Sequence, residues 1–374
     1  MIISLNNKKT KQIMKLKTKT LLKALNQIDF DKSKYNPLNL LSIQIVKNAG
    51  RLKLSYSDDI GRVISILIDC QQIDIDDDID DIDINVDFEK FTKLVKTIKS
   101  DIITLEYNKR SELKINNYYL QGDLSYSFNN LLESLEYKKI LQISSDQFVK
   151  MINQVKPAIE KDKSYYDTNS ININSDNNKL NLIATDGKIM ILKTQDIDIQ
   201  EINEIIPDCA VKQIIKAFKN NELLTISIHN EKCRKIKIES NDIIFYSQLN
   251  DGKFPDVKKY SYLTNYEVKI NKKELIETTK EALAISTSSH NRTIFNFQDN
   301  ILEIKVMEQH EVKYSNQINI DGVINEIIHL NAKLLLNILK SIDDDIFILK
   351  IKDKISTVVI EANNFMALIS PLSQ

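Results

Sequence analysis

Glycine, proline and cysteine are scarce in this chain, and each scarcity removes a class of protein. Only 6 Gly and 5 Pro occur among 374 residues, so an enzyme with a glycine-rich, phosphate-cradling loop is a poor first expectation. The three cysteines, Cys70, Cys209 and Cys233, lie far apart and form no C-x-x-C pair. This argues against a disulfide scaffold or a zinc ribbon and suits a reducing compartment.

Net charge and long apolar runs are also lacking. The 51 Lys+Arg against 52 Asp+Glu give a net charge of -1, which argues against a protein that coats DNA with a wholly basic surface but permits a local basic stripe. No stretch approaches the roughly 18 apolar residues of a membrane span. Residues 1–13 have no apolar core of a secretory signal, and we expect them to form a basic extension. The default is a soluble cytoplasmic protein.

Two different motifs each recur three times. Residues 16–25, 143–152 and 270–279 each read as a strand end, a polar cap and an amphipathic helix, at a spacing of 127 residues. A second helical motif at 94–98, 214–218 and 338–342 recurs at spacings of 120 and 124 residues. Alternating strands follow each copy of the second motif, at 102–107, 223–228 and 346–351. Self-similarity at a fixed period indicates a repeat architecture.

The segments between these helices read as short strands separated by Asn, Asp and Ser turns, for example 51–56, 63–68, 179–183 and 301–306. Few helices and many meandering strands predict an α+β fold, with helices packed on antiparallel sheets. We expect an extension at 1–13 and three like domains at 14–138, 139–264 and 265–374.

Lysines gather on or beside the repeated helices. They could face a phosphate backbone, or they could simply form the polar face of helices in a Lys-rich chain. The positions are Lys23, Lys96, Lys99, Lys150, Lys212, Lys216, Lys219, Lys273 and Lys340.

Four segments carry a family resemblance. They are the A-T-D-G turn at 184–187, the D-G-K-F-P-D turn at 251–256, the pair Tyr165-Tyr166, and the apolar tail at 365–372. In order and separation they resemble the bacterial DNA polymerase III β subunit, the sliding clamp, and the resemblance extends from Met14 to Gln374.

The resemblance implies a DNA-clamp fold in which two head-to-tail subunits close a ring, with helices lining the hole and sheets forming the outer wall. It implies no active site and no cofactor, because a closed ring holds DNA by topology. The implied partners are a second copy, double-stranded DNA, the DNA polymerase III catalytic subunit, the clamp loader and other proteins with a clamp-binding motif. It implies a cytoplasmic, nucleoid-associated protein that binds no membrane.

The resemblance also assigns sites. For DNA it implies Lys161, Tyr165 and Tyr166, although the two tyrosines could instead pack on their own domain. Family members often carry a basic residue after the position of Pro207, where this chain has Asp208-Cys209, so Lys212 and Lys216 could substitute, together with Lys96 on the first domain.

A pocket for apolar partner peptides is implied between the second and third domains. Asp167 stands where an apolar wall residue is usual, and Ser370 and the Ser373-Gln374 end replace the usual Met and Arg-Leu, so we expect a more polar pocket. The implied positions are Asp167, Thr185, Gly187, Lys188, Ile189, Met190, Pro255, Lys259, Tyr260, His290, Leu368, Ser370, Pro371 and Leu372.

Tyr118 and Leu120 match one side of the family's subunit interface, and Ala284 and Ile285 match the facing side. Ordinary core packing is the alternative for these four residues. Three other functions stay open. One is a specialised or mobile-element clamp with altered partners, and another is a metal-binding enzyme that uses the acidic stretch 74–83. That stretch lacks the mid-loop Gly and terminal Glu of an EF-hand. The third is an interaction protein that does not encircle DNA.

Overall fold

The computed structural model describes residues 12–29, 39–46, 49–58, 61–74, 83–108, 112–123, 131–162, 164–165, 167–231, 233–255, 264–288 and 290–373. Contacts divide the chain into two compact units. Unit 1 comprises Met1–Asp146 and Lys212–Leu249, and unit 2 comprises Gln147–Val211 and Asn250–Gln374. The division passes through the middle repeat, because each half of that repeat pairs with a different neighbour. The three predicted domain boundaries remain a prediction.

Six α-helices occur in the described part of the chain and confirm the two predicted helical motifs. The first helices of the three repeats begin 127 residues apart, at residues 18, 145 and 272. The second helices begin at residues 88, 208 and 332. Their bounds are α1 (Thr18–Gln27), α2 (Phe88–Thr97), α3 (Ser145–Val155), α4 (Asp208–Ala217), α5 (Lys272–Ile285) and α6 (Ala332–Leu339).

Side-chain caps start three of these helices. Asp87 accepts a hydrogen bond from Lys90 N, Asn271 from Glu274 N, and Asn331 from Lys333 N and Leu334 N, which satisfies amides that the helix leaves without partners. The polar side-chain cap expected for the first of these helices is wrong. The N-cap of α1 is Lys17, which makes no side-chain cap bond, and the Thr18 hydroxyl donates to Ser100 O at 2.6 Å.

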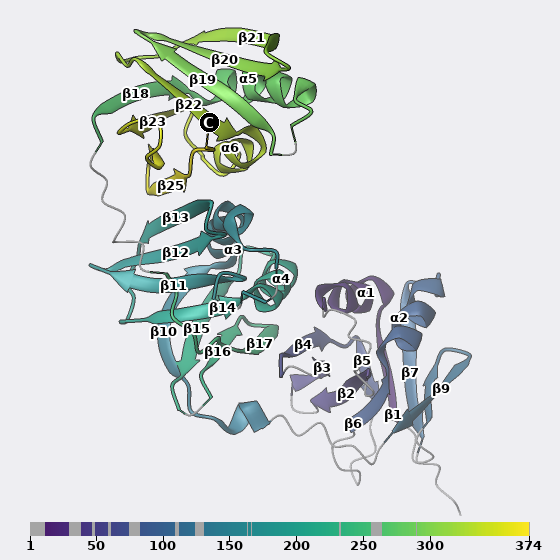
Figure 1. The fold of residues 1–374 in the computed structure, drawn as a ribbon. Helices are drawn as coiled ribbons and strands as arrows, with labels where there is room; N and C mark the ends of the chain where they lie inside the picture. The colour runs from purple at the N-terminus through teal and green to yellow at the C-terminus, as the bar shows by residue number, and fades with distance from the viewer. Residues whose placement is uncertain are drawn as a thin grey trace, which may run out of the picture. The chain divides into compact units, whose positions relative to one another are not determined.

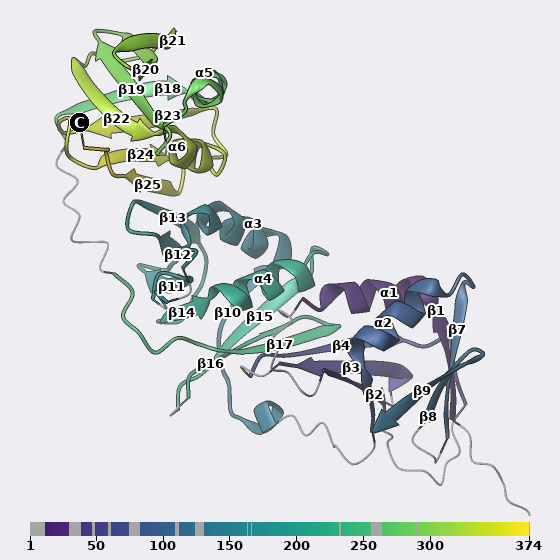
Figure 2. The ribbon, with the colours of Figure 1, turned by 45° about the vertical axis from the view of Figure 1, so that its right-hand side comes forward.

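Unit 1 is built on one antiparallel sheet of thirteen strands, in the order β10-β15-β16-β17-β4-β3-β2-β6-β9-β8-β7-β1-β5. Helices α1 and α2 lie side by side on it (Figure 2). The strand bounds are β1 (Gln12–Lys17), β2 (Leu40–Val46), β3 (Arg51–Ser57), β4 (Val63–Asp69), β5 (Gln72–Asp74), β6 (Asp83–Asp87), β7 (Ile102–Asn108), β8 (Glu112–Ile115), β9 (Tyr118–Asp123), β10 (Lys138–Ser144), β15 (Leu223–His229), β16 (Lys235–Glu239) and β17 (Ile243–Gln248).

Unit 2 holds two antiparallel sheets, with orders β14-β11-β12-β13-β25-β24-β23-β18 and β21-β20-β19-β22. Helices α5 and α6 pack on each other, and α5 also contacts β20 and β21 (Figure 1). The strand bounds are β11 (Ser170–Asp176), β12 (Lys179–Thr185), β13 (Ile189–Asp196), β14 (Asn203–Pro207), β18 (Tyr266–Asn271), β19 (Arg292–Gln298), β20 (Ile301–Glu308), β21 (Glu311–Asn319), β22 (Glu326–Asn331), β23 (Ile346–Ile351), β24 (Val358–Ala362) and β25 (Phe365–Ile369).

The apolar stripes of the helices close the cores under these sheets. Phe91 and Val95 of α2 and Leu275 of α5 are buried, and so are alternating strand residues such as Leu54 and Ile304. Full burial of one such side chain stabilises the fold by about 1.5–3 kcal/mol.

In the part of the chain that is described, no helix has both the length and the apolar character to cross a membrane.

The middle repeat joins each neighbour by one strand pair. In unit 1, β17 pairs with β4 through Ile243↔Ile66 to Tyr246↔Val63. In unit 2, β13 pairs with β25 through Ile189↔Ile369 to Lys193↔Phe365. These two pairs make each sheet continuous across two repeats.

Candidate functional site

An apolar cluster marks the place where β13 meets β25. Met190 and Leu368 are cross-strand partners, and both are buried with Ile183 and Val359. Their surroundings are only partly buried: Leu192, Phe254 and Met366 pack against the cluster and reach its rim. The cluster therefore joins the core of unit 2 to an apolar surface.

A tight turn holds one edge of this cluster. The Thr185 hydroxyl donates to Ile189 O at 2.8 Å and accepts from Gly187 N at 3.1 Å. Asp186 Oδ1 accepts from Lys188 N at 2.9 Å and Ile189 N at 2.8 Å. Gly187 has φ +79°, a conformation that glycine adopts without steric cost. The A-T-D-G motif therefore supplies the side-chain oxygens that bond this turn and the glycine that its positive φ requires.

The C-terminal tail forms the opposite edge and is tied to the main chain. Ser370 N donates to Lys188 O at 2.9 Å, and Leu372 N donates to His329 O at 2.7 Å. The Arg292 guanidinium donates to Ser373 O. Burial and the neighbouring Arg292 charge lower the pKa of His329, which favours the neutral imidazole beside the tail.

Asp167 brings a carboxylate close to the same site. Its Oδ1 occupies the space beside Gly252, where an added Cβ would lie only 1.6 Å away. Gly252 precedes Phe254 by two residues, and Phe254 packs on the cluster. The D-G-K-F-P motif therefore does two things: its glycine makes room for Asp167, and its phenylalanine supplies an apolar wall.

Most of the predicted pocket residues come together in this region. Thr185, Gly187, Lys188, Ile189 and Met190 form the turn and the start of β13, and Leu368, Ser370, Pro371 and Leu372 form the end of β25 and the tail. Pro255 follows Phe254, and His290 lies in the exposed turn before β19. Lys259 and Tyr260 fall outside the described residues.

Sequence reasoning missed several contributors. Ile183, Val359, Phe254 and Met366 build the cluster, and Arg292 holds the tail. The sequence could have indicated Phe254, because it lies inside the D-G-K-F-P motif. It could not have indicated Ile183 and Val359, since a buried strand residue at a site has the same pattern as one in the core.

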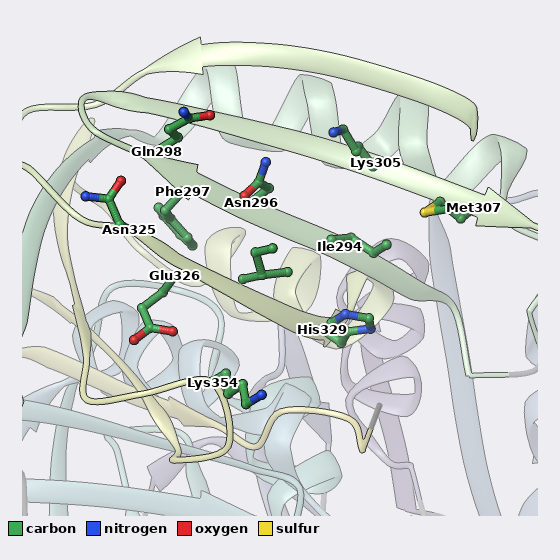
Figure 3. Close-up of a pocket in the computed structure, with 11 residues that line it drawn as sticks. Ile294, Asn296, Phe297, Gln298, Lys305, Met307, Asn325, Glu326, His329 and Lys354 are labelled. Atoms are coloured by element: carbon green, nitrogen blue, oxygen red, sulfur yellow. The ribbon is translucent and has the colours of Figure 1, made fainter. Parts of the chain in front are cut away.

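A separate hollow of about 840 Å³ lies on the face of the four-stranded sheet in unit 2. Ile294 and His329 are cross-strand neighbours there, and Figure 3 shows them beside Asn296 and below Lys305 and Met307. None of its lining residues belongs to the predicted pocket. His329 links the two places, because its carbonyl holds Leu372.

The residues predicted to contact DNA lie on both units. In unit 2, Lys161 is exposed, and the Tyr165 side chain is 62% exposed, so it does not pack in the core. Tyr166 lies outside the described residues. In unit 1, Lys96 and Lys212 are exposed, and Lys216 forms an ion pair with Asp29 at 3.5 Å.

The residues predicted for a subunit interface are at the surface. Tyr118 on β9 is 54% exposed and Ile285 at the end of α5 is 45% exposed. Leu120 is half-buried and Ala284 is exposed. Core packing, the alternative for these four positions, is therefore wrong for Tyr118, Ala284 and Ile285.

Residues 75–82 of the acidic stretch lie outside the described part of the chain. Within the described ranges, no group of three or more His, Cys, Asp or Glu side chains is arranged to hold a metal ion. The predicted metal site on that stretch therefore stays a prediction.

The chain is similar to known proteins of one family. Residues 142–256 match the family described as "DNA polymerase III beta subunit, central domain". A "Beta sliding clamp" of Rickettsia bellii is 23% identical over 350 residues, covering 88% of this chain and 90% of the relative. A second one, from Buchnera aphidicola subsp. Acyrthosiphon pisum, is 24% identical over 269 residues, covering 70% and 72%.

Solved structures show the same fold. The crystal structure of a putative DNA polymerase III β subunit from Eubacterium rectale superposes with a TM-score of 0.85 at 19% identity, covering 97% of this chain and 100% of the other. A Pseudomonas aeruginosa sliding clamp bound to griselimycin superposes with a TM-score of 0.86 at 16% identity, with the same coverage. The α+β clamp architecture predicted from the sequence is thereby confirmed.

Proposed function

Because the chain is a divergent relative of the bacterial DNA polymerase III β subunits, we propose that it encircles duplex DNA as a head-to-tail homodimer and tethers the replicative polymerase. One observation carries the proposal. Two equivalent strand pairs join successive repeats inside the chain, β4 with β17 and β13 with β25, and the repeat assigns β21 and β9 to a third pair that one chain does not form.

The correspondence follows the repeat. Strands β4 and β13 pair with the closing strands β17 and β25. The third pair would join β21, an edge strand of its sheet, to β9, the closing strand of the first repeat. Strand β9 lies between β8 and β6, and it pairs with β6 only at Gly122 and Asp123. Tyr118 on β9 and Val312 on β21 are 54% and 55% exposed. An uncovered edge strand invites pairing, and two identical head-to-tail contacts close a two-fold ring.

Such a ring needs no catalytic site, because the topological link itself retains DNA. Lys96, Lys161, Lys212 and Tyr165 would contact the phosphate backbone weakly and without sequence preference. Contacts of this kind release counterions and weaken steeply with salt, which suits sliding. The proposed place of action is the nucleoid in the cytoplasm.

The cluster around Met190 and Leu368 would bind short apolar peptides of the polymerase, the clamp loader and other partners. Support comes from its partly buried rim of Leu192, Phe254 and Met366 and from a tail fixed by three hydrogen bonds. Methionine walls adapt to different apolar side chains.

Asp167 favours a second candidate, a specialised clamp with altered partner choice. Its carboxylate lies beside Gly252, close to the rim residue Phe254. A carboxylate there disfavours burial of an uncharged apolar side chain against it and would favour peptides with a basic residue at that position. Affinity for partner peptides with and without such a residue separates the two candidates.

Retention on DNA tests the proposed encirclement. The protein is loaded onto nicked circular duplex by a clamp loader and ATP, free protein is removed by gel filtration, and the circle is then cut once. We expect protein to elute with the circle and to be lost after linearisation. Equal retention on circular and linear DNA would contradict a topological link.

Removal of the tail tests the pocket. Truncation after Ile369 deletes the residues that bond to Lys188, His329 and Arg292, so we expect an intact fold and loss of binding to a polymerase-derived clamp-binding peptide, measured by fluorescence anisotropy. Deletion of Gln374 alone is the matched control and should leave affinity unchanged. Peptide binding that survives the longer truncation would overturn the pocket assignment.

A further inference from the structure

One glutamine recurs at the places where successive repeats meet. Gln27 and Gln154 are 127 residues apart, each near the end of a first helix. Gln27 Nε2 donates to Ala217 O at 3.0 Å, and Gln154 Nε2 donates to Ser341 O at 2.8 Å. Ala217 and Ser341 are themselves 124 residues apart, as the second motif requires. We name these contacts the first and second junction.

Each junction has further polar contacts. At the first, Gln213 Nε2 donates to Gln27 O at 2.8 Å, and Gln213 Oε1 accepts from Asp29 N at 2.7 Å. At the second, Lys150 Nζ lies 2.9 Å from Asp343 Oδ2, which also accepts from Gln154 at 3.2 Å.

The repeat spacing defines a third set of equivalent positions. One half of this set lies on α5 in the last repeat and the other half on α2 in the first repeat. Glu281 on α5 stands 127 residues after Gln154, and Thr97 at the end of α2 stands 120 residues before Ala217. Burial shows that this set is uncovered. Ala217 and Ser341 are buried, whereas Thr97 is exposed; Gln154 is buried, whereas Glu281 is exposed.

The two uncovered faces carry complementary charges. Glu277 occupies the position of Lys150, and Lys99 occupies the position of Asp343, so the ion pair of the second junction recurs there with its signs reversed. Lys93 occupies the position of Gln213, which contacts Gln27. Gln213 contacts the main-chain carbonyl of Gln27, so Lys93 would approach the main chain of Glu281. Within its own copy Lys93 lies 3.4 Å from Glu89 with its side chain 76% exposed, so it would have to turn to Glu281 when the two copies meet.

Glu281 cannot make the glutamine's hydrogen bond. A carboxylate only accepts hydrogen bonds, so it has nothing to donate to the Thr97 carbonyl, and that carbonyl lies at the negative end of a helix. Tyr314 Oη donates to Glu281 Oε2 at 2.7 Å and holds the carboxylate at the surface of α5. A cation from the other side is the partner that this arrangement suits.

We propose that two copies of the chain close through an ion-paired junction, with Glu277 of one copy against Lys99 of the other and Glu281 against Lys93. This inference rests on the proposed ring. Each junction inside the chain has an amide-to-carbonyl hydrogen bond, and the second adds the exposed Lys150–Asp343 ion pair. The junction between copies would have the exposed ion pairs without that hydrogen bond, and salt screens such pairs. The dimer therefore dissociates more readily as salt increases.

The test measures the dimer dissociation constant by sedimentation at NaCl concentrations from about 0.05 to 0.5 M, a range over which exposed ion pairs become screened. Glu277→Lys with Glu281→Lys should weaken the dimer about tenfold or more at low salt. Adding Lys93→Glu and Lys99→Glu to the same chain should restore it. The pair Glu281→Gln with Lys93→Gln should keep the dimer and flatten its salt dependence.

Glu201→Lys is the matched control, because Glu201 is exposed in unit 2 and lies outside α5; it should leave the dissociation constant unchanged. The substituted residues are exposed, and an unchanged thermal transition confirms folding. A stable dimer that ignores these substitutions, or a fourfold variant no tighter than the double one, would overturn the ion-paired junction. A chain that stays monomeric at every salt concentration would instead overturn the ring itself.

Discussion

The two strand pairs that join the middle repeat to its neighbours share a backbone geometry and differ in their side chains. Beside β4–β17 the fold places charge: Arg51 Nε lies 2.8 Å from Asp69 Oδ1, and its Nη2 also bonds to Asp242. Beside β13–β25 it places the apolar cluster of Met190 and Leu368. Side-chain-capped turns flank both pairs: Ser240 Oγ accepts from Ile243 N before β17, and Asp186 Oδ1 accepts from Ile189 N before β13. The apolar cluster and the tail held by Lys188 and His329 are described at the second pair. The side chains added around a repeated strand pair therefore decide its surface chemistry.

Burial separates the two junctions as well. Gln154 is 6% exposed, whereas Gln27 is half-buried, although both make the same hydrogen bond. A hydrogen bond contributes more to stability where loss of its donor leaves a buried acceptor without a partner. We therefore expect Gln154 to contribute more to the free energy of unfolding than Gln27, although the two occupy the same repeat position.

The largest expected effect is on the cluster. Leu368→Ala removes a buried side chain beside Met190 and should lower the free energy of unfolding by about 2–5 kcal/mol, as measured by urea denaturation. Met366→Ala, on the partly buried rim, is the control and should cost clearly less. Equal losses for both would show that the cluster is not a packed core.

The junction glutamines come next. Gln154→Ala should destabilise the protein by about 1–3 kcal/mol, because it leaves the Ser341 carbonyl without its side-chain donor in a buried place. Gln27→Ala should cost about 0.5–1.5 kcal/mol, the usual net value of a hydrogen bond. A larger loss for Gln27→Ala than for Gln154→Ala in urea denaturation would contradict the idea that burial sets the contribution of each hydrogen bond.

A smaller effect is expected at the charged pair of unit 1. Asp242→Asn removes one partner of Arg51, but the Asp242 side chain is 51% exposed, so the loss should be about 0–1 kcal/mol and should fade at high salt. The measurement is the difference in unfolding free energy between wild type and variant at two ionic strengths. A loss that does not change with salt would mean that Asp242 acts through packing.

The smallest effect concerns pH at the second junction. Burial alone would raise the pKa of Asp343, but the hydrogen bond and charge of Lys150, with Lys193 and Gln154, hold that pKa below its usual range. A carboxyl group whose pKa is lowered by folding stabilises the protein above the unfolded-state pKa, about 3.9, and loses this contribution as the pH falls through the folded-state pKa. The stability difference between wild type and Asp343→Asn should therefore be present at about pH 5 and shrink toward about pH 3. A difference that is constant with pH would assign the effect to shape rather than charge.

The sequence pattern predicted most of the fold and part of the site. Helical and alternating periodicity located α1 to α6 and strands such as β7, β15 and β23, because amphipathic elements carry their burial in their spacing. The cap of α1 escaped prediction, since Thr18 bonds to Ser100 O, 82 residues away in the sequence. The same reason hid the bond from Arg292 to Ser373 O, which spans 81 residues.

The junctions show a further limit. The repeat spacing alone aligns Gln27, Gln154 and Glu281, but only the structure shows that the first two donate to carbonyls at equivalent positions. Without that contact, Glu281 reads as one more exposed charge on a helix. The repeat spacing therefore points to an interface residue only after the structure has shown the contact that an equivalent residue makes.

Solution mass over a range of protein concentrations tests the central claim most directly, namely that two copies close head to tail. The chain has a mass of 43.2 kDa. We predict a species of twice that mass which does not grow as the concentration rises, because two identical contacts leave no free end. A monomer at every concentration, or a mass that increases without limit, would contradict a closed two-copy ring.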